Sequence, residues 1–175
     1  MLAAMKSLDL LIVGAGFGGL YMLHKARGMG LDALAIEAAP GVGGTWYHNR
    51  YPGARVDIQS VEYSYSFDEA LQQEWRWRER YAPQPELLRY ANHVADRFGL
   101  RDGIALNTRM RGARFDEPTR RWQVQAADGR QWSARFLVMA NSFGRPTGED
   151  KTSLLFAVQH KAGALYGALE SFKKF

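Results

Sequence analysis

The sequence predicts an α/β fold with a parallel sheet, and three observations near its start lead to this prediction. An apolar run from Leu10 to Val13 is typical of a buried strand, and a glycine-rich segment, Gly14 to Gly19, follows it at once. Residues 20–27 combine helix formers with apolar residues at helical spacing, and Gly28 marks the end of this helix. A second apolar run over residues 31–36 predicts the next strand. This order of elements indicates a Rossmann-like nucleotide-binding domain.

The glycine-rich segment has glycine at each position where a dinucleotide-binding turn needs it. Gly14 permits a tight turn, Gly16 lets the backbone approach a pyrophosphate, and Gly19 lets the helix pack closely on the strand. Glu37 falls at the tip of the second strand, where its carboxylate can accept hydrogen bonds from a ribose diol and would repel a 2′-phosphate. The alternative interpretation is a glycine turn followed by a solvated acid.

Length and composition predict one soluble domain. The 175 residues can bury one sizeable core but are short for two complete domains. No apolar run approaches the roughly 18 residues of a membrane span, and the N-terminus does not resemble a secretory signal. We therefore expect a cytoplasmic protein without a membrane partner. The absence of cysteine excludes disulfides, thiolate metal sites and cysteine nucleophiles.

The net charge of +5 raises the question of nucleic-acid binding, because Trp75-Arg76-Trp77-Arg78 interleaves aromatic and basic side chains. Alternation of this kind is more typical of a half-buried face whose arginines are solvated, and Glu74 and Glu79 flank the run. We therefore expect no nucleic-acid partner. A polyanionic cofactor accounts for the positive charge equally well.

The rest of the chain predicts a loop, a helix and a β-meander. Residues 38–46 contain one proline and three glycines, which suit a loop, and residues 47–66 suggest irregular, aromatic-rich structure over a pocket. Apolar residues at helical spacing predict a helix over residues 85–98, which Gly99 ends. Three extended segments are expected, of which the last would re-enter the parallel sheet through residues 136–140. These segments cover residues 104–115, 121–127 and 131–139.

Three parts of the sequence belong together: Gly14 to Gly19, Glu37, and the segment Gly43 to Asp57, which reads GGTWYHNRYPGARVD. Together they resemble the FAD-binding start of Baeyer-Villiger monooxygenases, which are class B flavin monooxygenases. The resemblance covers roughly residues 8–140. It implies FAD rather than NAD at this site, and for the whole enzyme it implies NADPH as second cofactor and insertion of oxygen into a ketone. The fold it implies is a Rossmann-like FAD-binding domain with a parallel sheet and a β-meander insertion.

The resemblance also implies which residues bind the cofactor. Glu37 would take the adenosine ribose, and Met110 would offer its backbone to the adenine. Ordinary core, strand or turn packing is the alternative role for Thr45, Trp46, Tyr63 and Met110. The full set of implied cofactor-binding residues is Gly14, Gly16, Phe17, Gly19, Glu37, Gly44, Thr45, Trp46, Asp57, Tyr63 and Met110.

Asp57 is the one catalytic candidate. In the family, the matching acid positions a catalytic arginine near the flavin, because a carboxylate orients a guanidinium through two hydrogen bonds. That arginine comes from the later NADPH domain and has no evident counterpart in this sequence. The alternative is that Asp57 is a solvated loop acid.

The resemblance stops near Ser142, which stands where the family has a permissive glycine. We predict an FAD-binding domain over residues 1–143 and an unmatched tail over residues 144–175. No second glycine fingerprint for NADPH follows, and the four histidines have no metal-ligand spacing, so no metal site is expected. Two functions stay open: the FAD-binding part of an NADPH-dependent monooxygenase, or a noncatalytic FAD- or nucleotide-binding module.

Overall fold

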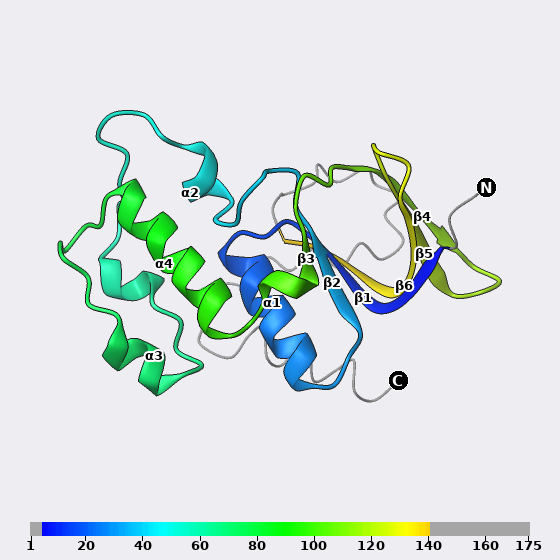
Figure 1. Cartoon of the computed structure of the whole chain (residues 1–175), viewed down its shortest axis with the longest axis horizontal. Helices are drawn as coiled ribbons and strands as arrows, with labels where there is room; N and C mark the ends of the chain where they lie inside the picture. Colours follow the sequence, from blue (N-terminus) through cyan, green and yellow to red (C-terminus); the bar gives the residue numbers. More distant parts are fainter. Residues whose placement is uncertain (1–4, 141–175) are drawn as a thin grey trace.

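A computed structural model describes residues 5–140 and shows one mixed sheet with helices packed beside it (Figure 1). The sheet has the strand order β3-β2-β1-β6-β5-β4. Its strands are β1 (Lys6–Val13), β2 (Ala33–Ile36), β3 (Ile104–Ala105), β4 (Met110–Asp116), β5 (Arg121–Ala126) and β6 (Gln131–Met139). The helices are α1 (Phe17–Gly28), α2 (Thr45–His48), α3 (Glu69–Glu74) and α4 (Gln84–Arg97), with 3-10 turns at Ser60–Tyr63 and Arg101–Gly103. The predicted α/β class is confirmed.

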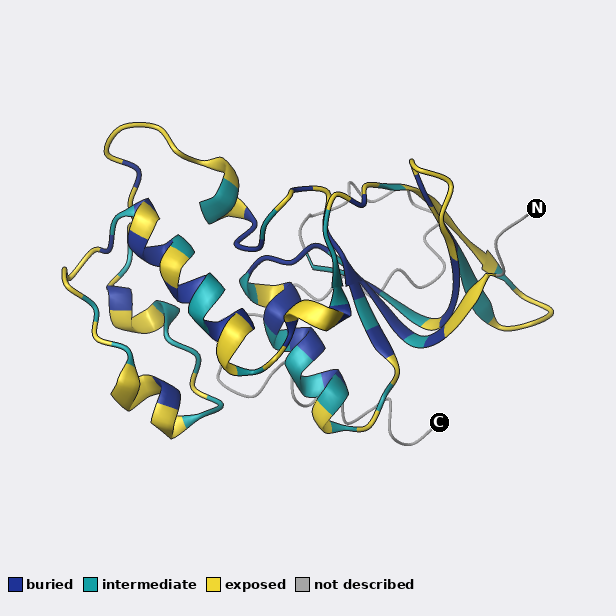
Figure 2. Ribbon diagram, in the orientation of Figure 1, coloured by how far each residue is buried: buried dark blue, intermediate teal, exposed yellow. Residues whose placement is uncertain are grey.

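The parallel strands β3, β2, β1 and β6 form the centre of the fold. β1 is buried on both faces, which explains its continuous apolar run. Leu10 and Ile12 pack with α1 and α4, whereas Leu11 packs with apolar side chains of β5 and β6. Figure 2 shows the buried residues gathered in the central strands and on the inner faces of the helices. Two core layers therefore hold the end of β1 in place.

β6 belongs to both parts of the sheet. It runs parallel to β1 from Trp132 to Met139, and its first half pairs antiparallel with β5. The predicted meander is thus present, and residues 136–139 return to the parallel sheet as expected. Arg121 joins the two parts, because its guanidinium donates to Ser133 Oγ at 2.8 Å and to the Leu8 carbonyl at 2.7 Å.

The prediction of one strand over residues 104–115 is wrong. The chain pairs with β2 at residues 104–105, leaves the parallel sheet, and starts the meander as β4 at Met110. Asn107 takes a left-handed conformation (φ 52°) in between, and the Thr108 amide donates to the Glu37 carbonyl at 2.7 Å. The two halves have different partners, and a pattern of extended residues does not reveal this.

The helices differ from the predictions mainly at their boundaries. α1 and α4 are confirmed, while α3 was not expected, and α2 begins at the end of the predicted loop. The tryptophans of the segment 75–78 lie inward on Tyr90, and its arginines are exposed, so this segment is the half-buried face expected from its alternation. None of the helices within residues 5–140 has the length and apolarity that crossing a membrane requires. The predicted strand segment 136–140 ends at the last residue that the structure describes. Ser142 and the predicted tail over residues 144–175 lie outside the described residues.

Candidate cofactor site

The glycine turn after β1 is held by backbone contacts. Gly14 has a φ of 103°, and its amide donates to the Ile36 carbonyl of β2 at 2.8 Å. A Cβ atom on Gly19 would lie 2.0 Å from the Gly14 carbonyl oxygen. The first turn of α1 therefore packs against the end of β1 at a distance that only glycine allows.

The N-terminus of α1 faces a second glycine segment. Gly16 caps the helix without a side-chain hydrogen bond, and the first turn contains no acidic residue. The Gly43 amide donates to the Ala15 carbonyl at 2.9 Å, and a Cβ on Gly16 would lie 3.4 Å from the Gly44 Cα. Backbone atoms thus line this surface, and the first-turn amides of α1 have no partner inside the helix. Such a surface favours a phosphate group.

Glu37 ties four segments together. It is 5% exposed, and its two carboxylate oxygens accept hydrogen bonds from the Ala15 amide at 2.7 Å and from the Ala39 amide at 2.8 Å. Its own amide donates to Ala105, and its carbonyl accepts from Thr108. Each carboxylate oxygen keeps a second lone pair. Glu37 therefore positions the glycine turn and can still accept a hydrogen bond from a ligand.

A cavity of about 320 Å³ lies where β1, β2 and β6 end and β4 begins. Three of the predicted cofactor residues, Gly14, Glu37 and Met110, line it together. His48 and Arg109 also line this cavity, and sequence reasoning missed both. The position of Arg109 beside Met110 was an available signal, whereas nothing in the sequence placed His48 next to β2. The remaining lining residues are Val13, Ile36, Ala38, Thr108 and Met139.

A group of aromatic side chains lies at the start of α1. The ring centroids of Phe17 and Tyr63 are 5.7 Å apart and those of Trp46 and Tyr63 are 5.8 Å apart, both with edge-to-face geometry. Burial, and secondarily the nearby Asp57 carboxylate, raises the pKa of the Tyr63 phenol. Asp57 and Thr45 are exposed. The structure thus places the predicted cofactor residues in two groups joined by the glycine turn.

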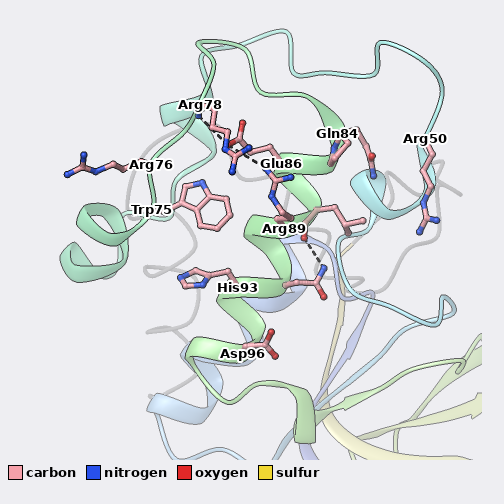
Figure 3. Close-up of a pocket in the computed structure, with 12 residues that line it drawn as sticks. Arg50, Trp75, Arg76, Arg78, Gln84, Glu86, Arg89, His93 and Asp96 are labelled. Carbon is pink, nitrogen blue, oxygen red and sulfur yellow. Dashed lines mark hydrogen bonds and ion pairs between the residues drawn. The ribbon is translucent and has the colours of Figure 1, made fainter.

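Within residues 5–140, no group of three or more His, Asp or Glu side chains is placed to hold a metal ion. A larger cavity of about 850 Å³ lies on α4, and none of the predicted cofactor residues lines it (Figure 3).

The parallel sheet, the glycine turn and the buried acid after β2 define a Rossmann-type dinucleotide-binding domain. In agreement, the family of NAD(P)-binding Rossmann-like domains matches residues 12–73. Phenazine N-monooxygenase PhzNO1 from Lysobacter antibioticus is 48% identical over 133 residues, which are 75% of this chain and 25% of that protein. Acetone monooxygenase from Gordonia sp. is 47% identical over 132 residues, again 75% and 25% of the two chains.

A solved structure of oxidized steroid monooxygenase bound to NADP superposes with a TM-score of 0.76 at 52% identity, covering 81% of this chain and 28% of that one. The chain is therefore a homologue of the flavin monooxygenases of Baeyer-Villiger type, as its glycine and GGTWYHNRYPGARVD segments indicated. It spans about a quarter of the length of the curated relatives it matches.

Proposed function

We propose that this chain binds FAD along the glycine turn, with the adenosine in the cavity beside Glu37 and the flavin beside Trp46 and Tyr63. The observation that carries the proposal is the 320 Å³ cavity, which joins Gly14, Glu37 and Met110 next to the N-terminus of α1. A dinucleotide needs an anion site between two sites for flat rings, and the two residue groups provide this order.

Each group has a chemical task in this proposal. The first-turn amides of α1, beside Gly16 and Gly44, hold the pyrophosphate. Glu37 accepts from the ribose diol with the lone pairs that Ala15 and Ala39 leave open. Trp46 and Tyr63 provide flat apolar surface, and Thr45 provides a hydroxyl at its edge. FAD supplies redox chemistry when it is bound, and the residues named here bind and orient it.

We propose further that this FAD site serves an NADPH-dependent monooxygenase that inserts oxygen into a ketone in the cytoplasm. The homology to acetone monooxygenase supports a ketone, and the homology to phenazine N-monooxygenase shows that relatives differ in substrate. The proposal assigns no residue within 5–140 to NADPH or to the substrate, and it places both of these sites outside the segment that matches the relatives.

The second candidate is a noncatalytic FAD-binding module, in which Asp57 would be a solvated loop acid. In agreement with that role, Asp57 is exposed and makes no ion pair within residues 5–140. A module of this kind would retain the cofactor cradle without the groups that react with oxygen and substrate.

A visible spectrum tests both candidates. The purified chain should turn yellow with FAD. The absorption bands of the flavin should show resolved fine structure, because the ring leaves water when it binds. A colourless protein after incubation with FAD and removal of excess cofactor would sink the flavin proposal. If FAD binds, anaerobic mixing with NADPH separates the candidates, because rapid bleaching is expected of the enzyme and not of the module.

A further inference from the structure

A cavity forms a groove on the side of α4, which we call the α4 groove. It has a volume of about 850 Å³, within the range of small-molecule sites. Figure 3 shows Arg78 and Arg89 beside Glu86 near the first turns of α4, with Arg76 on one side and Arg50 on the other. The groove is also lined by Trp75, Gln84, Pro85, Leu88, Asn92, His93 and Asp96.

The charges that line the α4 groove do not cancel. The residues that line the groove include four arginines and only two carboxylates, those of Glu86 and Asp96. Asp96 already accepts two hydrogen bonds from Arg101, which does not line the groove. Glu86 is buried and accepts from the Arg78 backbone amide at 3.2 Å. The guanidiniums of Arg50, Arg76 and Arg78 have no carboxylate partner within residues 5–140. The groove therefore carries an excess of positive charge.

The two arginines next to Glu86, Arg78 and Arg89, have side-chain N–H donors that make no hydrogen bond to the residues the structure describes. Arg89 Nη2 lies 3.8 Å from Glu86 Oε1, which is an ion pair but too long for a hydrogen bond, and half of the Arg89 side chain is exposed. The Arg78 side chain makes no hydrogen bond to any residue the structure describes, since only its backbone contacts Glu86. Two adjacent guanidiniums with open donors match the paired oxygens of a phosphate or a carboxylate.

One buried nitrogen at the same groove lacks a partner. Trp75 Nε1 is buried and makes no hydrogen bond to any residue the structure describes, and Trp75 lines the groove. His93 Nε2, in contrast, lies 3.1 Å from Glu74 Oε1. A buried donor without an acceptor destabilises the protein, so binding of an acceptor at this position is favoured. The Trp75 indole is a donor only. The unpaired cations and the unpaired indole donor thus point to the same kind of ligand.

We propose that the α4 groove binds a small organic molecule through its phosphate or carboxylate group. Arg78 and Arg89 hold the oxyanion, the Trp75 indole N–H turns to donate to it, and Pro85 and Leu88 contact the organic part. Nucleic acid is the disfavoured ligand, because Trp75 packs on Tyr90 with ring centroids 5.1 Å apart, and its face is not open for stacking with a base. None of the residues proposed to bind FAD lines the α4 groove, although Gln84 of the groove donates to the Trp46 carbonyl.

Proton-nitrogen NMR of the ¹⁵N-labelled chain tests the proposal. Loss of one indole signal in Trp75→Phe assigns the Trp75 resonance. Phenyl phosphate and benzoate are then titrated separately, with benzyl alcohol as the neutral probe. We expect a saturable downfield shift of the Trp75 signal with at least one anion and no shift with the alcohol. The stronger anion shows whether the site selects phosphate or carboxylate.

The variant Arg78→Gln/Arg89→Gln should weaken anion binding by about tenfold or more, as loss of charge-assisted hydrogen bonds implies. The matched control is Arg111→Gln/Arg114→Gln, which removes the same charge from exposed positions on β4 and should leave the affinity unchanged. Equal weakening by both double variants, no shift of the Trp75 signal, or equal binding of benzyl alcohol would overturn the proposal. Thermal unfolding followed by circular dichroism verifies that each variant is folded before titration.

Discussion

The residues at the two ends of the proposed cofactor site are held in place by different interactions. At the glycine turn, backbone amides donate hydrogen bonds of 2.7–2.9 Å to backbone carbonyls and to the Glu37 carboxylate, and these bonds join the end of β1 to β2 and to the loops around Glu37. At the aromatic end, Trp46, Tyr63 and Phe17 meet through edge-to-face ring contacts, which contribute about 0.5–1.5 kcal/mol each. Trp46 and Tyr63 are partly exposed. The adenosine-phosphate end is therefore built into the fold, whereas the flavin end can adjust its side chains to a ligand.

The largest effect is expected at Gly19, where the fold and the site depend on the same contact. Gly19→Ala places a methyl group where a Cβ would lie 2.0 Å from the Gly14 carbonyl oxygen, so α1 must move away from β1. Overpacking against backbone, which cannot yield as a side chain does, should lower the free energy of unfolding by about 3 kcal/mol or more. Urea denaturation measures this change.

Gly28→Ala is the matched control for this variant, because Gly28 lies in the same helix and a Cβ there meets nothing within 4 Å. It should leave the stability unchanged or raise it by up to about 1 kcal/mol. Similar stabilities of the two variants would show that the turn and α1 separate easily, and the contrast between a built-in end and an adjustable end would then be wrong.

The second prediction separates binding from folding at the same end. Gly16 has a φ of −77°, which any residue adopts, and a Cβ there would lie 3.4 Å from the Gly44 Cα. Gly16→Val should therefore fold yet lose FAD binding, because its side chain fills the space through which the backbone approaches the pyrophosphate. Flavin fluorescence titration measures the affinity. Gly112→Val, on the exposed strand β4, is the control, and retained FAD binding by Gly16→Val would contradict the proposed cradle.

The same contrast explains what the sequence could predict. The glycine turn and Glu37 are set by local rules, since the turn type, the helix start and the strand tip follow from neighbouring residues. The split between β3 and β4 and the place of His48 beside β2 depend on contacts between distant segments. α3 was missed because it is a short helix whose start depends on the Asp68 carboxylate accepting from the Leu71 amide, within a segment of mixed aromatic and polar residues.

A smaller effect is expected from Glu37→Gln. The amide group can accept from only one of the two backbone donors, Ala15 and Ala39, and its NH₂ group faces the other donor. We expect a loss of about 1–3 kcal/mol in unfolding free energy, measured by urea denaturation, and about tenfold weaker FAD binding. Glu117→Gln, an exposed acid in the turn after β4, is the control. If only FAD affinity fell and stability stayed constant, Glu37 would act on the ribose and not as a link between loops.

The smallest effect is expected at the adjustable end, in Asp57→Asn. Because Asp57 is exposed and has no ion-pair partner among the described residues, FAD affinity should stay within about twofold of the original value. The carboxylate contributes to raising the pKa of Tyr63, so its removal should lower that pKa toward the value that burial alone gives. Ultraviolet titration of tyrosinate, with Tyr63→Phe to identify the signal and Asp128→Asn as the remote control, measures this shift. A large loss of FAD affinity with an unchanged Tyr63 pKa would instead mean that Asp57 contacts the cofactor directly, and that the flavin end is as closely built as the glycine turn.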